Sequence, residues 1–118
     1  MPEQTIFTKI INREIPAKIV YEDELFIAFH DIQPSAPVHV LLVTKEAYPS
    51  LEAVDESDTE LHGKILQTAR KVAKQLGIQA NYKLMMNVGP EVQQVHHIHL
   101  HILGGWKLHS EPKELPSL

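Results

Sequence analysis

The sequence lacks cysteine and long apolar runs, and each absence excludes a class of protein. Without cysteine there is no disulfide framework, no zinc site built on thiolates and no thiol nucleophile. No apolar run approaches the roughly 20 residues of a membrane-spanning helix. The N-terminus has no basic segment followed by an apolar stretch, as a signal peptide would. We therefore expect a cytoplasmic protein that does not interact with membranes.

Positive charge is also scarce. The chain has 11 lysines and arginines against 15 aspartates and glutamates, a formal net charge of −4. This balance argues against non-specific binding to nucleic acid, so we expect no nucleic-acid partner. It does not exclude a small phosphorylated ligand, because a local pocket can be positive on an acidic protein. The length of 118 residues is that of one domain, which we expect to span residues 1–118.

Apolar periodicity predicts an α+β fold. Residues 4–15 have helical spacing that ends before Pro16, and residues 55–76 form a longer amphipathic helix that ends at Gly77. Short β-branched and apolar runs predict five strands, at residues 18–23, 25–31, 38–45, 82–88 and 95–103. Consecutive strands with short connections favour an antiparallel sheet over a parallel βαβ fold.

The segment "HHIHLHIL" holds four of the eight histidines of the chain. Side chains alternate between the faces of a strand, so His97, His99 and His101 share one face and the apolar residues between them share the other. His96 falls on the apolar side by parity and is not part of the group. His39 alternates with valine and leucine in "VHVLLV" and joins the group if the two strands are close.

Three interpretations fit this histidine row. A solvated strand face would need the strict alternation with isoleucine and leucine to be accidental. A metal site is chemically reasonable, because two histidines spaced H-x-H on a strand bind zinc, iron or copper, with Asp31 or Glu91 as a carboxylate ligand from a loop. A catalytic cluster is the third, in which one imidazole attacks while its neighbours fix its tautomer and transfer protons. The residues alone leave the last two open.

In "HIHLHIL", histidine alternates with apolar residues. This pattern resembles the motif of the histidine triad family. The segment "TIFTKIINREIPAKIVYEDELFIAFHDIQPSAPVHVLLVTK" is similar to the N-terminal half of Hint-type histidine triad nucleotide-binding proteins. "LMMNVG" and "HLHILGG" are similar to their C-terminal half. The resemblance covers residues 5–105 and leaves 106–118 as a divergent tail. It implies an antiparallel sheet of about five strands with two helices, and a homodimer in which two sheets join.

The resemblance implies a reaction at the α-phosphorus of a nucleoside 5′-phosphate derivative. His99 would attack phosphorus and form a nucleotidyl-histidine intermediate, which water then hydrolyses. His101 would contact the phosphate and the leaving group, while His97 would orient the others and His39 would hydrogen-bond within the group. The mechanism requires no metal and no other cofactor.

The resemblance also implies a binding site for a purine nucleotide of the AMP type. Asp31 would accept hydrogen bonds from the ribose hydroxyls, and Asn87 would reach the phosphate. The residues expected to line the base pocket are Phe7, Phe29, His30 and Ile32, with Ile10 and Ile15 near it.

The loop "NVGPEVQQVHH" departs from the family pattern. It is one residue shorter than in many relatives, and Gln94 stands where they carry a small hydroxyl residue. The glutamine amide can still donate a hydrogen bond to a phosphate or a leaving group, so Gln94 belongs to the predicted nucleotide site. Both this loop and the tail at 106–118 differ from the family pattern, so the sequence does not determine the leaving group of the substrate.

The function that fits best is hydrolysis of the P–N bond of purine nucleoside 5′-phosphoramidates. A dinucleoside polyphosphate hydrolase of the same superfamily and a nucleotide-binding scaffold with vestigial catalysis are the alternatives. A nucleotidylyltransferase fits less well, because that branch has glutamine where this chain has His101. A metal-dependent enzyme of cupin type would have more strands and no long helix at 55–76.

Overall fold

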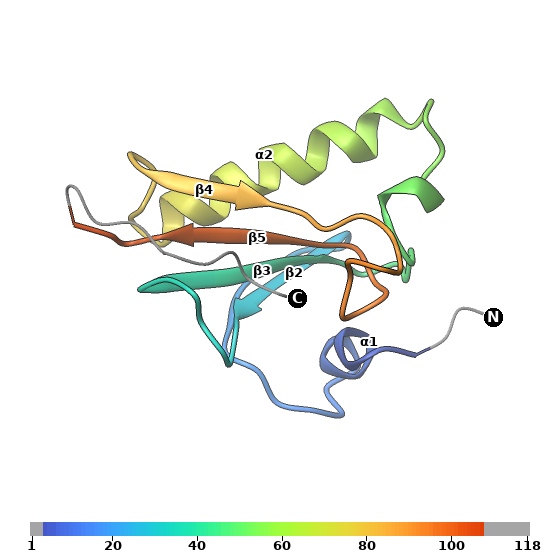
Figure 1. Ribbon diagram of the computed structural model, residues 1–118, viewed down its shortest axis with the longest axis horizontal. Helices are drawn as coiled ribbons and strands as arrows, with labels where there is room; N and C mark the ends of the chain where they lie inside the picture. The colour runs from blue at the N-terminus through green and yellow to red at the C-terminus, as the bar shows by residue number, and fades with distance from the viewer. Residues whose placement is uncertain (1–3, 108–118) are drawn as a thin grey trace.

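A computed structural model describes residues 4–107 and shows a five-stranded antiparallel sheet with a helix on each face (Figure 1). The strands lie in the order β1-β2-β3-β5-β4. Their bounds are β1 Ile19–Glu22, β2 Phe26–His30, β3 Val38–Thr44, β4 Tyr82–Met85 and β5 His99–Gly104. The helices are α1 Ile6–Ile11 and α2 Thr59–Gln75, and a 3-10 turn, η1, covers Leu51–Ala53. The predicted α+β class, antiparallel sheet and two helices are confirmed.

Helix α2 covers one face of the sheet and builds the larger core. Asp58 caps its start by accepting a hydrogen bond from the backbone N–H of Leu61. The helix ends where Gly77, with φ of +75°, takes up the left-handed conformation that glycine tolerates. Apolar residues at three- and four-residue spacing make this helix amphipathic, as predicted. Ile65, Ala69 and Val72 are buried, and Leu61 and Leu76 are half-buried. This core contains Ile65, Ala69, Val72 and Ala73 of the helix against Phe26, Ala28, Val40, Leu42, Leu100 and Ile102 of the sheet.

Helix α1 lies on the opposite face, over a smaller core (Figure 1). Phe7 and Ile10 of the helix pack against Ile27, Phe29, Leu41 and Val43 of the sheet. Because strand side chains alternate, β5 turns Leu100 and Ile102 to α2 and its histidines to the α1 side. The histidines therefore sit in a covered apolar environment and not on an open sheet face.

Two predicted boundaries were wrong. The last strand begins at His99 and not at residue 95, because residues 94–97 form bends and the N–H of Ile98 donates to the carbonyl of Tyr48 in a distant loop. The long helix begins at Thr59 and not at residue 55. Residues 55–57 form a local turn in which the Asp55 carboxylate accepts hydrogen bonds from the backbone N–H and hydroxyl of Ser57.

Two further elements end at least three residues earlier than predicted. The first helix stops at Ile11, because Arg13 has a left-handed φ of 63° that ends the helical path. Strand β4 ends at Met85, so Asn87 lies beyond the strand and not at its end. The turn η1 was not predicted at all.

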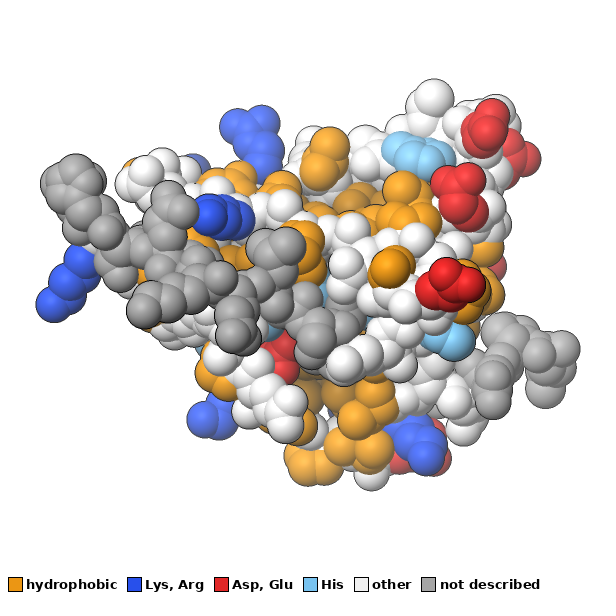
Figure 2. Space-filling view, viewed as in Figure 1, with side chains coloured by type: hydrophobic (Ala, Val, Ile, Leu, Met, Phe, Trp, Pro, Cys, Tyr) orange, Lys and Arg blue, Asp and Glu red, His pale blue; other side chains and the backbone are white. Residues whose placement is uncertain are grey.

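Charged side chains are unevenly distributed over the molecule. Figure 2 shows acidic side chains gathered on the side where α2 begins and basic ones towards the side where it ends. This arrangement complements the helix dipole. Among the described residues no helix is long and apolar enough to cross a membrane. The tail beyond residue 107, which we expected to lack regular structure, lies outside the described residues.

Candidate active site

His99, at the start of β5, has one anchored ring nitrogen and one without a partner. Its Nδ1 lies 2.7 Å from the carbonyl oxygen of His97. A carbonyl only accepts, so Nδ1 carries the proton and the lone pair is on Nε2. Nε2 is buried and has no hydrogen-bond partner among the described residues. A buried ring nitrogen with an unpaired lone pair is suited to nucleophilic attack.

His97 lies just before β5 and is held at both ring nitrogens. Its Nε2–H donates to the carbonyl of Thr44 at 2.7 Å, and its Nδ1 accepts from the hydroxyl of Thr5 at 3.0 Å. Burial lowers the pKa of His97, the hydrogen bond to Thr44 raises it, and the neighbouring His99 lowers it; the net direction is down. His97 is therefore a neutral, fixed imidazole, and its carbonyl in turn holds His99.

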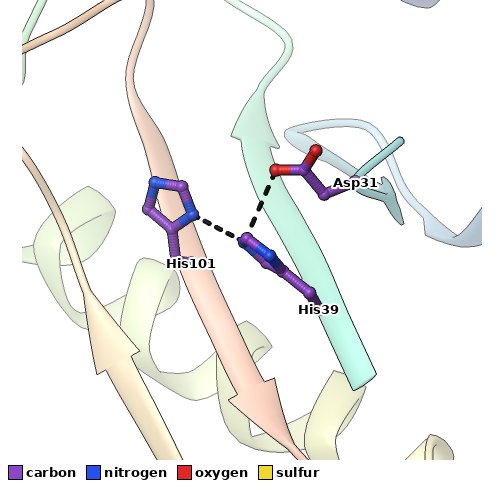
Figure 3. A group of neighbouring side chains, drawn as sticks. All are labelled: Asp31, His39 and His101. Carbon is purple, nitrogen blue, oxygen red and sulfur yellow. Dashed lines mark hydrogen bonds and ion pairs between the residues drawn. The ribbon is translucent and has the colours of Figure 1, made fainter. Parts of the chain in front are cut away.

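His39, on β3, is hydrogen-bonded to His101 on β5. Figure 3 shows the two rings side by side, with His39 Nε2 at 2.9 Å from His101 Nδ1. The other ring nitrogen of His39, Nδ1, accepts from the backbone N–H of Ser35 at 2.9 Å. Burial lowers the pKa of His39, against a smaller opposing effect of the Asp31 carboxylate. The ring of His101 also meets that of His99 edge-on, with centroids 5.3 Å apart.

Asp31, predicted to hold the ribose, lies against this pair of histidines (Figure 3). Its side chain is 2 % exposed. Oδ1 accepts from the backbone N–H of Gln33 at 2.8 Å, while Oδ2 is 3.5 Å from His39 Nε2. A carboxylate has about four acceptor positions, so this placement leaves capacity for a ligand.

The aromatic residues of the predicted base pocket form a continuous group with the histidines. Phe7 and Phe29 are buried with ring centroids 5.7 Å apart, and Phe7 also meets the ring of His99 at 4.9 Å. His30 is half-buried, and Ile32 is 90 % exposed at the surface. The structure therefore brings Phe7 and Phe29 to the histidines and leaves Ile32 free to contact a ligand.

The remaining predicted residues lie in the small core under α1 or in the segment between β4 and β5. Ile10 is buried and Ile15 half-buried in the small core under α1. Asn87 is half-buried, and Gln94 is exposed in the loop before His97. An open pocket of about 420 Å³ lies beside that loop, lined by Gln4, Thr5, Ile6, Ala47, Pro49, Gln94, Val95 and His96.

Comparison with known proteins identifies the family. The sequence profile of the HIT domain matches residues 12–108. The chain belongs to the HIT family. An uncharacterised HIT-like protein of Synechocystis sp. is 56% identical over 106 residues, covering 89% of this chain and 93% of that protein. Purine nucleoside phosphoramidase of Escherichia coli (strain K12) is 45% identical over 107 residues, covering 89% of this chain and 90% of the enzyme.

Solved structures agree with this assignment. A HIT family hydrolase from Clostridium thermocellum superposes with a TM-score of 0.83 at 42% identity, covering 94% of this chain and 98% of that one. These relatives place the chain among the HIT-family hydrolases.

The geometry of the histidines also tests whether this site could bind a metal ion. Asp31, His39 and His101 each offer a ligand atom, and these atoms lie within 4.8 Å of one another. The Nε2 of His39 carries the proton that joins the two rings, because the N–H of Ser35 occupies Nδ1. A cation bound between the rings would have to displace this proton, and the ring has no second position for it. The donor set therefore fits a hydrogen-bonded pair better than a metal.

Three partners of the HIT-family histidines were missed in the sequence. The hydroxyl of Thr5, the carbonyl of Thr44 and the N–H of Ser35 each hold a ring nitrogen. The sequence offers a weak indication that Thr5 forms hydrogen bonds, because threonine is a common helix cap and Thr5 caps α1. The other two act through the backbone, which residue type does not reveal.

Proposed function

We propose that this HIT-family protein hydrolyses purine nucleoside 5′-phosphoramidates, as an adenosine 5′-monophosphoramidase. The observation that carries the proposal is His99, whose Nδ1–H is held by a carbonyl while its buried Nε2 keeps a lone pair. The 45% identity to a purine nucleoside phosphoramidase supports the choice of substrate. The pairing of a fixed nucleophile with a neighbouring proton donor supports the reaction type.

In the first step, Nε2 of His99 attacks the α-phosphorus and the P–N bond breaks. The departing nitrogen takes the proton from Nε2 of His101, and the Nε2–H of His39 stabilises the electron-rich ring that remains. In the second step, water attacks phosphorus, the bond to His99 breaks, and the water proton returns to His101. The products are the free amine and the nucleoside monophosphate, and the enzyme is regenerated.

The nucleoside end of the substrate would occupy the side of the site formed by the β2–β3 loop. We propose that Asp31 accepts hydrogen bonds from the ribose hydroxyls and that Phe7, Phe29, His30 and Ile32 contact the base. Asn87 and Gln94 would donate amide hydrogen bonds to the phosphate and the leaving group. Ile32 supports this placement, because a fully exposed isoleucine gains from being covered by a base.

A homodimer in which two sheets join is part of the same proposal. Strand β4 is at the edge of the described sheet, which is the position where a second sheet can join it. Leu84 on this strand and Leu66 on α2 are both exposed. Light scattering on the purified protein tests the dimer: a monomer mass at micromolar concentration would contradict it.

The activity is tested with an adenosine 5′-phosphoramidate that releases a fluorescent amine, in the presence of excess EDTA. We expect the wild type to release the amine and AMP in equal amounts and His99→Ala to release neither. A dinucleoside polyphosphate and a guanosine phosphoramidate run in parallel define the substrate class. If the wild type binds AMP but turns over no phosphoramidate, the proposed function is wrong.

A further inference from the structure

The β2–β3 loop, residues 31–37, closes on one side chain, that of His39. The N–H of Ser35 donates to His39 Nδ1 at 2.9 Å, and the Asp31 carboxylate lies 3.5 Å from His39 Nε2. His39 is itself 2 % exposed. The loop therefore presents a donor to one ring nitrogen and a negative charge to the other.

These two contacts select the same tautomer of His39. A backbone N–H only donates, so Nδ1 must be the unprotonated nitrogen. The proton is then on Nε2, where the carboxylate of Asp31 also favours it. This Nε2–H donates to His101 Nδ1 at 2.9 Å, so His101 in turn accepts at Nδ1 and carries its own proton on Nε2.

We propose that the backbone N–H of Ser35 is a positioning group for the reaction, because it sets the tautomer of His101 through His39. The proposal rests on the proposed function for its catalytic consequence, since donation to a leaving nitrogen requires a proton on Nε2 of His101. In the opposite tautomer, Nε2 of His101 would present a lone pair to the leaving nitrogen and could not donate a proton to it.

The tautomers of the wild-type protein are the first test, and they need no activity. Nitrogen-15 NMR of histidine-labelled protein near neutral pH distinguishes a protonated ring nitrogen from an unprotonated one. We expect the proton on Nε2 of both His39 and His101, with signals assigned by single substitution of each. A proton on Nδ1 of either ring would overturn the proposal, whether or not the protein is a phosphoramidase.

Substitution of Ser35 is the second test. Ser35→Pro removes the N–H, while the matched control Ser35→Ala keeps it and removes only the hydroxyl. We expect Ser35→Pro to lower kcat for a basic amine leaving group by roughly 10²-fold or more, the usual contribution of a positioned proton donor. Ser35→Ala should stay within about twofold of wild type, because the backbone donor is intact.

A second substrate separates positioning from general damage. An adenosine 5′-phosphoryl nitrophenyl ester has a leaving group that needs no proton, so Ser35→Pro should lower its kcat much less. Equal losses for both substrates, or a folded Ser35→Pro variant with wild-type kcat, would overturn the proposal. If circular dichroism shows that Ser35→Pro does not fold, the wild-type tautomers decide. Failure of the proposed function would instead appear as no amine release by the wild type.

Discussion

Replacing Thr5 with valine tests the contact that joins the first helix to the histidines. Valine has nearly the same shape as threonine and lacks only the hydroxyl group. In the wild type this hydroxyl oxygen accepts from the N–H of Thr8 at 3.3 Å, and the hydroxyl donates to Nδ1 of His97 at 3.0 Å. The substitution therefore removes a helix cap and leaves a buried ring nitrogen without a partner.

The two losses have known sizes. Loss of a helix cap costs about 1 kcal/mol. A buried acceptor left without its donor costs about 1–3 kcal/mol. We therefore expect Thr5→Val to lower the free energy of unfolding by about 2–4 kcal/mol, a large part of the stability of a small domain. Thr5→Ser keeps the hydroxyl and removes one methyl group, so it should lose about 1 kcal/mol or less.

Urea unfolding followed by circular dichroism measures both variants, with the free energy obtained by linear extrapolation. The kcat of Thr5→Val should also fall, because a displaced His97 no longer holds Nδ1 of His99 through its carbonyl. If Thr5→Val is as stable as Thr5→Ser within about 0.5 kcal/mol, the reasoning about this hydroxyl is refuted.

Four further results are expected. His99→Ala should abolish turnover and keep AMP binding by calorimetry; near-normal turnover would exclude it as the nucleophile. Asp31→Ala should weaken ribonucleotide binding more than deoxyribonucleotide binding, and equal losses would exclude the ribose role. Gly105→Ala should lower the urea midpoint, because φ is +82° and the added methyl would lie 2.9 Å from a valine side chain; an unchanged midpoint contradicts this. Burial lowers the pKa of His39 and His97, so the unfolded chain binds more protons as pH falls below about 6.5 and stability should fall, by up to about 1.4 kcal/mol per pH unit for each histidine. Constant stability between about pH 7.5 and 5.5 would contradict this.

The features that depend on local pattern were predictable from the sequence. The buried stripe of α2 and the two faces of β3 and β5 follow from periodicity, which residue type records directly. The start of β5 was not predictable, because the N–H of Ile98 bonds to the carbonyl of Tyr48, fifty residues earlier in the chain. A contact of this kind is set by how the loops pack and leaves no local signal.

In the candidate site too, local sequence pattern predicted some features, and contacts between distant parts of the chain set the others. Strand parity placed His99 and His101 together, and the structure has their rings 5.3 Å apart. The tautomers of these rings are held by partners that parity does not reveal, among them the backbone N–H of Ser35 and the carbonyl of His97. Asp31 was predicted as a ribose ligand or, in the metal interpretation, as a carboxylate near the histidines, and the path of the β2–β3 loop shows that it lies against His39.

The central claim is that His99 Nε2 becomes bonded to phosphorus during turnover. Rapid acid-free quenching of the enzyme with an adenosine 5′-phosphoramidate, followed by mass spectrometry of the intact protein and its peptides, tests this directly. We expect a transient adenylyl group on the peptide that contains His99, absent in His99→Ala and discharged by water to AMP. An adenylyl group on another residue, or turnover without any covalent adduct together with inverted configuration at phosphorus, would contradict the account.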